Sequence, residues 1–383
     1  MISFDDNPFH QKEKGLIIQS FFDGRNSHAQ LFHGPSGNGK FSTAMAYTAL
    51  LLCEQPTDRG ACTTCTSCKQ MAKLTHPDVH FVFPTHKDAS NDLTGRSEEL
   101  IKQWRNAVIS NPYLSLGDWK RFVDAEQKNF EIRVIEAEYI NEKLSFKSFY
   151  GGYKVVFIWL PEDLHPSTAN KLLKNIEEPE DKTVIIMVSE RYGQLMPTIT
   201  SRMQSVYFPR LTEEEVRRTL EAKNIESAQV LAQLAEGNLA TAFELADQSD
   251  ALTELARYFT LWMRVSYSVN MPEIVKLSED LSKKSRGFAM AFLQFSLQTI
   301  RQAVLSNFRP SAENPIFANT DFKMANFAKI VNPENAWLLM NEIDSAISDI
   351  DRTCSIKIVM TDLSIRVHYL LKRGGIPKAL DIF

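Results

Sequence analysis

The sequence contains no apolar run long enough to cross a bilayer, and its first fifteen residues lack the apolar core of a secretory signal. We therefore expect a cytoplasmic protein with no membrane partner, whose five cysteines are reduced. An excess of positive charge is also missing, because 43 lysines and arginines face 47 aspartates and glutamates, for a net charge of −4. The whole chain is thus no polycation, so any contact with nucleic acid depends on a local patch or on partners.

Short apolar runs alternate with helical patterns through the first part of the chain. The runs predict strands at 29–33, 79–83, 154–160, 184–188 and 205–208. Strands that alternate with helices indicate a parallel α/β sheet. The longest of these runs are almost continuously apolar, which is typical of strands that are buried on both faces.

Two changes of pattern divide the chain into three predicted domains. Residues 1–209 form the α/β domain, with a polar and irregular insertion at 85–130. Residues 210–248 contain short helices and are expected to form a helical lid. Residues 249–383 show only helical signals, and their apolar stripes could serve a core of their own or contact with other subunits.

A glycine-rich segment follows the first predicted strand and opens a helix: Gly34-Pro35-Ser36-Gly37-Asn38-Gly39-Lys40. Its spacing matches the GxxxxGK phosphate-binding loop, in which backbone N–H groups attract phosphate and the lysine reaches the terminal phosphates. The next position normally carries the Ser or Thr that holds Mg²⁺, but here it is Phe41, and Ser42 comes one residue late. We predict a P-loop fold with poor Mg²⁺-dependent hydrolysis. The residues leave open whether the loop binds ATP or ADP, or is only a strand–helix turn.

Four of the five cysteines fall within sixteen residues: Cys53, Cys62, Cys65 and Cys68. Zinc takes four thiolates readily in a reducing compartment, whereas a redox C-x-x-C pair would not explain the other two cysteines. We predict a structural zinc knuckle over residues 53–68, with no coordination position open for catalysis. The fifth cysteine, Cys354, lies alone in the helical region and is expected to be a core thiol.

A P-loop with a four-cysteine knuckle after its helix is similar to the bacterial clamp-loader ATPases, which are AAA+ proteins. Five further segments resemble motifs of this family. Gly24-Arg25 with Ser27-His28-Ala29 resembles its entry motif, His76-Pro77-Asp78 its HPD motif, and residues 151–156 the lead-in to its Walker B strand. Residues 169–174 with Glu177-Glu178-Pro179 resemble its ANALLK…LEEP helix, and Ser201-Arg202 matches the first two letters of its SRC motif. The resemblance covers residues 15–245 well and the remainder loosely. It implies a RecA-like AAA+ domain, a small lid, and a helical collar that joins related subunits.

The departures from the family pattern resemble one kind of subunit, the delta-prime subunits of DNA polymerase III. The Walker B acids that hold Mg²⁺ are replaced by Leu160 and Pro161, and Glu162 lies one residue beyond. Ala240 stands where active subunits have a sensor arginine. In the family, delta-prime does not hydrolyse ATP but presents an arginine finger to the ATP of its neighbour. The resemblance therefore implies no intrinsic ATPase activity and gives Arg202 the role of that finger, the alternative being an ordinary surface ion pair.

The implied partners are delta-like and gamma/tau-like clamp-loader subunits and, through the complex, the sliding clamp and primer–template DNA. Two other functions stay open. The chain could be an active gamma/tau-like ATPase that uses the shifted Ser42 and Glu162. It could also be a zinc-dependent nucleic-acid-binding module with a decayed P-loop, although the acidic balance of the chain argues against that function.

Overall fold

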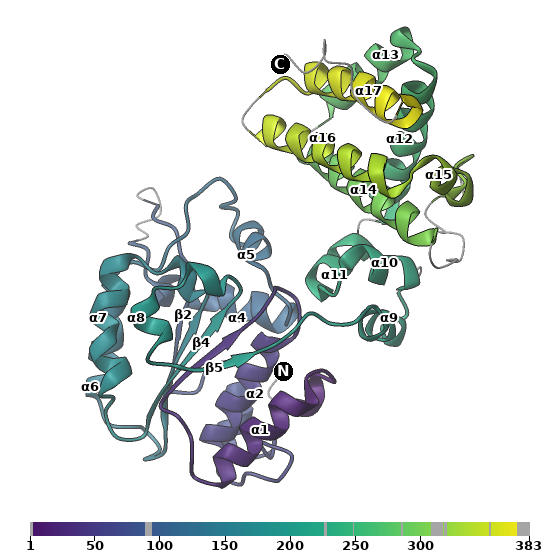
Figure 1. Cartoon of the computed structure of the whole chain (residues 1–383). Helices are drawn as coiled ribbons and strands as arrows, with labels where there is room; N and C mark the ends of the chain where they lie inside the picture. The colour runs from purple at the N-terminus through teal and green to yellow at the C-terminus, as the bar shows by residue number, and fades with distance from the viewer. Residues whose placement is uncertain are drawn as a thin grey trace. The chain divides into compact units, whose positions relative to one another are not determined.

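The computed structural model describes residues 3–88, 94–225, 228–247, 249–284, 286–307, 317, 320–351 and 354–373 (Figure 1). The chain divides into two compact units, residues 1–219 with 235–243 and residues 220–234 with 244–383. The first unit contains the sheet, and the second is helical. Among the described residues, no helix is long and apolar enough to cross a membrane.

Five parallel strands form the sheet, in the order β2-β3-β4-β1-β5. They are β1 Ala29–His33, β2 Val79–Val82, β3 Lys154–Trp159, β4 Thr183–Ser189 and β5 Gln204–Tyr207. Each strand begins and ends within one residue of the run that predicted it, and the expected parallel α/β sheet is confirmed. Because β1 pairs with both β4 and β5, the loop that follows β1 emerges inside the carboxyl edge of the sheet, not at its border.

Helices cover both faces of this sheet, as Figure 1 shows. One face carries α1 Gln11–Phe22, α2 Lys40–Leu52, α3 Thr66–Ala72, α4 Ile101–Ser110 and α5 Leu116–Phe122, and the other carries α6 Val134–Ser145, α7 Pro166–Glu177 and α8 Pro197–Thr200. Strand side chains alternate between the two cores. On β3, for example, Phe157 and Trp159 belong to the first core, and Val156 and Ile158 belong to the second.

The insertion at 85–130 contains α4, where the sequence predicted a helical stretch around Leu100 and Trp104, and a second helix, α5, that was not predicted. Trp104 on α4 and Trp119 on α5 are completely buried. The Trp104 ring stacks on Phe83 at 4.7 Å between centroids, and Trp119 Nε1 donates to the carbonyl of Pro84 at 2.9 Å. These tryptophans tie the insertion to the segment that follows β2.

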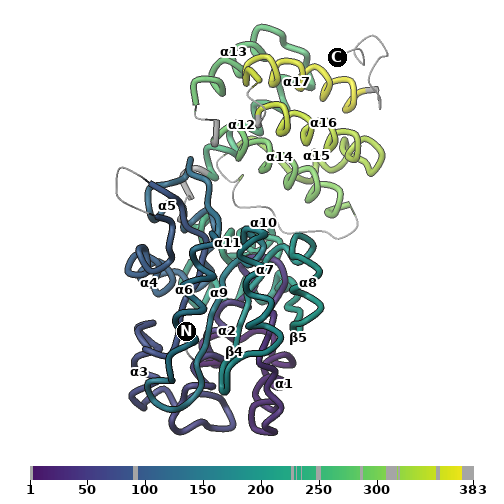
Figure 2. Tube along the Cα trace, turned by 90° about the vertical axis from the view of Figure 1, so that its left-hand side faces the viewer, coloured from purple at the N-terminus to yellow at the C-terminus, as the bar shows by residue number. Residues whose placement is uncertain are grey.

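After β5, the residues that the structure describes form helices and their connections (Figure 2). Its helices are α9 Glu213–Ala222, α10 Ala228–Ala235, α11 Leu239–Asp247, α12 Ser249–Ser268, α13 Met271–Lys283, α14 Arg286–Ser306, α15 Met324–Ile330, α16 Pro333–Asp351 and α17 Ile356–Arg373. In the second unit Trp262 is fully buried, and its Nε1 donates to the hydroxyl of Ser364 on α17 at 2.9 Å. Cys354 is exposed, so the expectation of a core thiol was wrong: the residue lies between α16 and α17, outside their buried stripes.

Candidate functional site

The glycine-rich loop joins the carboxyl end of β1 to the first turn of α2, as the sequence predicted. Gly39 precedes the helix with a φ of 88°, and a Cβ there would lie 2.7 Å from Asn7 Nδ2. That amide nitrogen donates to the Gly39 carbonyl at 2.9 Å and to the Thr43 hydroxyl at 3.1 Å. Asn38 Nδ2 donates to the carbonyl of Phe208, after β5, at 2.8 Å. The loop is therefore held by contacts within the chain.

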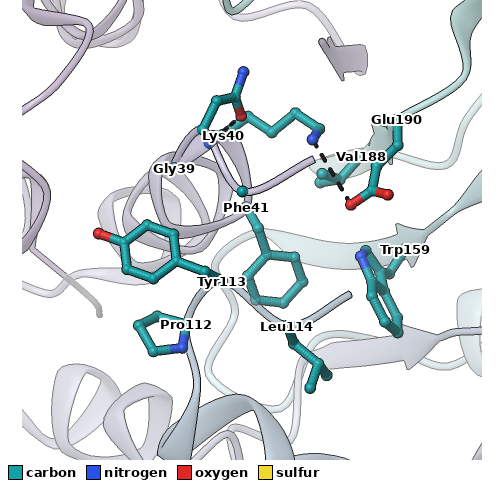
Figure 3. A pocket seen from close by; sticks show the side chains of 11 residues that line it. Gly39, Lys40, Phe41, Pro112, Tyr113, Leu114, Trp159, Val188 and Glu190 are labelled. Atoms are coloured by element: carbon teal, nitrogen blue, oxygen red, sulfur yellow. Dashed lines mark hydrogen bonds and ion pairs between the residues drawn. The ribbon is translucent and has the colours of Figure 1, made fainter. Parts of the chain in front are cut away.

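Lys40 is 3% exposed, and its ammonium group has partners inside the protein (Figure 3). Its Nζ donates to the carbonyl of Pro35 at 2.9 Å and lies 3.9 Å from Glu190 Oε1. Burial lowers the pKa of Lys40, and the charges of Glu190 and Glu162 oppose that shift. The lysine that would reach a terminal phosphate is thus directed at groups of its own chain.

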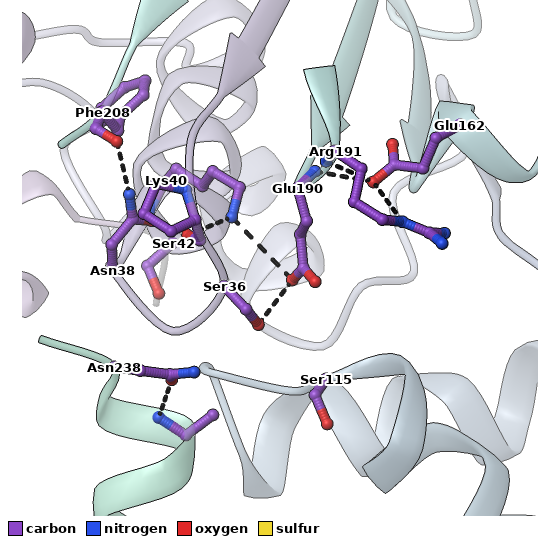
Figure 4. Close-up of polar contacts among 12 residues, drawn as sticks. Ser36, Asn38, Lys40, Ser42, Ser115, Glu162, Glu190, Arg191, Phe208 and Asn238 are labelled. Atoms are coloured by element: carbon purple, nitrogen blue, oxygen red, sulfur yellow. Dashed lines mark hydrogen bonds and ion pairs between the residues drawn. The ribbon is translucent and has the colours of Figure 1, made fainter. Parts of the chain in front are cut away.

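Glu190 follows the end of β4 and was not singled out from the sequence. Its Oε1 accepts a hydrogen bond from the Ser36 hydroxyl at 2.8 Å, as Figure 4 shows. Burial raises the pKa of Glu190, while Lys40 and Ser36 act in the opposite direction. The carboxylate therefore contacts both side chains of the loop that would otherwise face a phosphate.

Phe41 takes up the position where a hydrolysing P-loop places its Mg²⁺-binding hydroxyl. Its ring packs edge-on against Phe157 and Trp159 on β3 and against Trp104. Ser42 does not replace the missing hydroxyl, because its Oγ is directed to the carbonyl of Pro112 at 3.4 Å. The cavity left beside the loop measures about 10 Å³, which is about the room that one water molecule needs.

Glu162, the shifted acid after β3, has a side chain with no exposed surface. Its Oε1 accepts hydrogen bonds from the backbone N–H groups of Glu190 at 2.8 Å and Arg191 at 2.9 Å. The sequence resemblance puts Leu160 and Pro161 at the two Walker B positions, and in the structure Leu160 has a left-handed φ of 56°. Glu162 thus fixes the segment after β4, which is a structural use of the carboxylate.

The start of α11 closes the loop from the other side. Asn238 Oδ1 accepts from the N–H groups of Ala240 at 2.9 Å and Thr241 at 3.3 Å, which caps the helix. The N–H of Leu239 donates to the carbonyl of Gly37 at 2.9 Å. A Cβ on Gly37 would lie 1.7 Å from Asn238 Oδ1, so only glycine fits there. The expected lid segment lacks a cationic sensor at this contact.

The four clustered cysteines come together at the opposite end of α2, about 20 Å from the loop along the helix. Their sulfur atoms all lie within 4.8 Å of one another and could hold a metal ion. Cys68 Sγ is 3.7 Å from Cys53 Sγ and 3.9 Å from Cys62 Sγ. Sulfurs on a tetrahedron with metal–sulfur bonds of about 2.3 Å would be about 3.8 Å apart.

Backbone N–H groups point at these sulfurs, as thiolate ligands require. The N–H of Cys62 donates to Cys53 Sγ at 3.2 Å, and that of Cys65 donates to Cys62 Sγ at 3.4 Å. Burial alone would raise the pKa of Cys62, but hydrogen bonds from Thr64 and Cys65 lower it to about 6. The donor set and its spacing therefore fit a metal bound by four thiolates.

Arg202 lies in the turn between α8 and β5, which is the edge strand of the sheet. Its side chain is 37% exposed and forms an ion pair with Glu177, the last residue of α7. Its Nη1 donates to the carbonyl of Thr198 at 2.9 Å. Arg202 lines no part of the cavity beside Lys40, so the structure keeps this arginine separate from the chain's own loop.

Comparison with known proteins gives the relatives of this chain. A family model described as "DNA polymerase III, delta subunit" matches residues 10–212, more than half of the sequence. DNA polymerase III subunit delta' of Pseudomonas aeruginosa is 29% identical over 228 residues, which cover 58% of this chain and 57% of that protein. The subunit delta' of Bacillus subtilis is 23% identical over 292 residues, which cover 75% of this chain and 69% of the relative. This chain thus matches little more than half of the Pseudomonas protein's length.

Solved structures show weaker likeness. One is a DNA polymerase III gamma subunit-related protein from Thermotoga maritima, with 14% sequence identity and a TM-score of 0.42. The superposition covers 94% of this chain and 99% of that structure. The RuvB Holliday junction branch migration motor of the same organism covers 89% of this chain, and 91% of that structure is covered, at 14% identity and a TM-score of 0.36. From the family match and the named relatives, the chain belongs to the delta-prime family of DNA polymerase III clamp-loader subunits.

Proposed function

We propose that the chain is a clamp-loader subunit that does not hydrolyse ATP and that completes the ATP site of a neighbouring subunit with Arg202. The observation that carries the first part is the aromatic packing of Phe41, because it places a phenyl ring where Mg²⁺ needs an oxygen ligand. The Walker B positions add no acid, since Leu160 and Pro161 stand there. Nothing in the loop can therefore direct a metal ion or water at a phosphate.

The gamma/tau-like ATPase is disfavoured by the hydrogen bonds of the two residues that it needs. Ser42 donates to a carbonyl, and the buried Glu162 accepts from two backbone N–H groups. Moving either side chain toward a nucleotide would leave buried polar groups without partners, which costs free energy. We therefore place the chain among subunits that assist hydrolysis elsewhere.

Arg202 supports the second part of the proposal by its position and by the weakness of the ion pair that holds its guanidinium group. It stands beside the edge strand β5, where a neighbouring subunit has access, and more than a third of its side chain is exposed. An exposed ion pair such as that with Glu177 contributes only about 0–1 kcal/mol to folding, so the guanidinium is easily redirected to a phosphate. A planar guanidinium is also suited to bidentate phosphate contacts.

The metal we assign to the cysteine cluster is zinc, with a structural role. Cys53, Cys62, Cys65 and Cys68 would hold it through four thiolates, which leaves no position for water or substrate. A closed zinc site stabilises the small segment after α2, where few apolar residues are available. Binding of zinc should therefore matter for folding and not for chemistry.

The partners we propose are a delta-like subunit, gamma/tau-like ATPases and, through the assembled complex, the sliding clamp and primed DNA. The helical region over residues 249–383 would form the collar that joins these subunits. A net charge of −4 agrees with a chain that meets DNA mainly through partners. A cytoplasmic location follows from this role and remains a prediction.

The test is Arg202→Ala in the reconstituted clamp-loading complex, with ATP turnover and clamp loading on primed DNA as readouts. We expect turnover at the neighbouring ATP site to fall by about 10³–10⁵. Arg218→Ala is the matched control, because Arg218 is also exposed and ion-paired, with Glu214. Unchanged turnover with Arg202→Ala, or an equal loss with the control, would contradict the finger role.

A further inference from the structure

The side chain of Glu190, which follows β4, places a carboxylate group against the glycine loop. Glu190 Oε1 accepts from the Ser36 hydroxyl at 2.8 Å and lies 3.9 Å from Lys40 Nζ. Both groups lie in the loop, and both would otherwise be available to a bound phosphate. Figures 3 and 4 show the carboxylate directed at the lysine and the serine from the end of β4.

Because Lys40 is buried, its ammonium group cannot pair with Glu190 and with a bound phosphate at the same time without cost. Lys40 is 3% exposed, and a buried ammonium requires an anionic or hydrogen-bonded partner. A phosphate that entered the loop would either displace the carboxylate from Lys40 or lie beside a second, like charge. The cavity beside the loop is about 10 Å³, so an anion can enter only if the Glu190 side chain moves away from Lys40. A carboxylate paired with the ammonium group resists that movement more than a neutral side chain does.

The carboxylate is also held in place by its surroundings. Glu162 accepts from the N–H groups of Glu190 and Arg191, which fixes the backbone that carries Glu190. On the other side of the loop, Leu239 donates to Gly37 and Asn238 packs against it. The loop therefore has little freedom to open around a larger anion.

We propose that Glu190 is an internal substitute for phosphate, which occupies the glycine loop and keeps di- and triphosphate nucleotides out. The inference deepens the proposed function, because it names what keeps this subunit's own loop silent. It also predicts that the loop regains affinity for the pyrophosphate group when the carboxylate is removed. The ligand class is thus a polyphosphate anion, with Lys40 as the cation that binds it.

The experiment measures pyrophosphate and ADP binding to the full zinc-loaded chain by calorimetry, without Mg²⁺. Wild-type protein should bind neither anion measurably. Glu190→Ala and Glu190→Gln should both bind pyrophosphate at least about tenfold more tightly than the weakest binding that the calorimetry detects, because a nearby like charge is gone. Adding Lys40→Ala to either variant should abolish that binding. Glu138→Ala, an exposed glutamate paired with Lys171, is the control and should behave as wild type.

Three results would overturn the proposal: equal binding by wild type and both Glu190 variants, no gained binding in either, or gained binding that survives the loss of Lys40. If Glu190→Ala is too unstable to measure, Glu190→Gln keeps the shape of the side chain and carries the test. Thermal unfolding with and without pyrophosphate gives a second readout, since the anion should raise the melting temperature of the variants only. The Arg202 assay is independent, so failure there leaves this result standing, and the reverse also holds.

Discussion

Replacing Phe41 by threonine restores the hydroxyl that follows the lysine in hydrolysing P-loops, yet we expect a less stable and still inactive protein. The Phe41 ring is 9% exposed and lies 5.5 Å from Phe157, 6.1 Å from Trp159 and 6.2 Å from Trp104 between centroids. Truncation of a buried phenylalanine costs about 3–5 kcal/mol of unfolding free energy. The lower figure corresponds to a fall in melting temperature of about 6–12 °C for a domain of this size.

The assay is thermal unfolding followed by tryptophan fluorescence, together with Mg²⁺-dependent ATP hydrolysis. The fluorescence reports on the first unit through Trp104, Trp119 and Trp159 and on the second through Trp262 and Trp337. Phe41→Leu is the matched control: it keeps an apolar side chain and should cost less than the threonine variant. Threonine at this position should give no hydrolysis, because Leu160 and Pro161 still supply no acid. A melting temperature within about 2 °C of wild type would refute the packing estimate. Steady ATP turnover would refute the account of the silent loop.

Other parts of the first unit give further predictions. Cys62→Ser should lower the zinc content well below about one ion per chain and reduce thermal stability, and full retention of zinc in elemental analysis would contradict the site. Burial raises the pKa of Glu136 to about 7, so the folded protein keeps a proton that the unfolded chain releases, and stability should fall as pH rises from about 4.5 to 7. Glu136→Gln should flatten that pH profile and stabilise the protein at pH 8 by up to about 3 kcal/mol. If the free energy of unfolding, measured by urea titration at several pH values, keeps the same pH dependence in the variant, the prediction is wrong. Gly37→Ala should cost about 1–3 kcal/mol, because its Cβ would lie 1.7 Å from Asn238 Oδ1, and Asn238→Gly in the same chain should recover part of the loss.

The sheet and the loop were predictable because their signals are local. A strand buried on both faces needs an apolar run, and a phosphate-type loop needs glycines at fixed spacing next to a helix start. The clustering of the four cysteines was equally predictable, because the short sequence spacing of metal ligands brings their side chains close together. Within the insertion, Trp104, Trp119 and Phe122 were expected to be packing residues and not a base-stacking surface; both tryptophans are buried, whereas Phe122 is 46% exposed.

Glu190 and Asn238 were missed because their roles depend on distant contacts. Glu190 lies 154 residues from Ser36, and Asn238 reaches Gly37 from the segment after the sheet. A charged residue directly after a buried strand of a parallel sheet was the one available signal for Glu190, since such positions meet at the carboxyl edge. The three domain boundaries, the finger role of Arg202 and the identity of the metal remain predictions.

The internal contacts of the glycine loop have a consequence for how such motifs are interpreted. A Cβ on Gly34 would lie 2.0 Å from the carbonyl oxygen of Phe208, Gly39 is required by Asn7, and Lys40 serves as counter-ion to Glu190. Each letter of the GxxxxGK signature therefore has a structural role in this chain that requires no bound nucleotide. In this chain the informative position is the one after the lysine, where the Phe41 ring packs against Phe157 and Trp159 in place of an oxygen ligand.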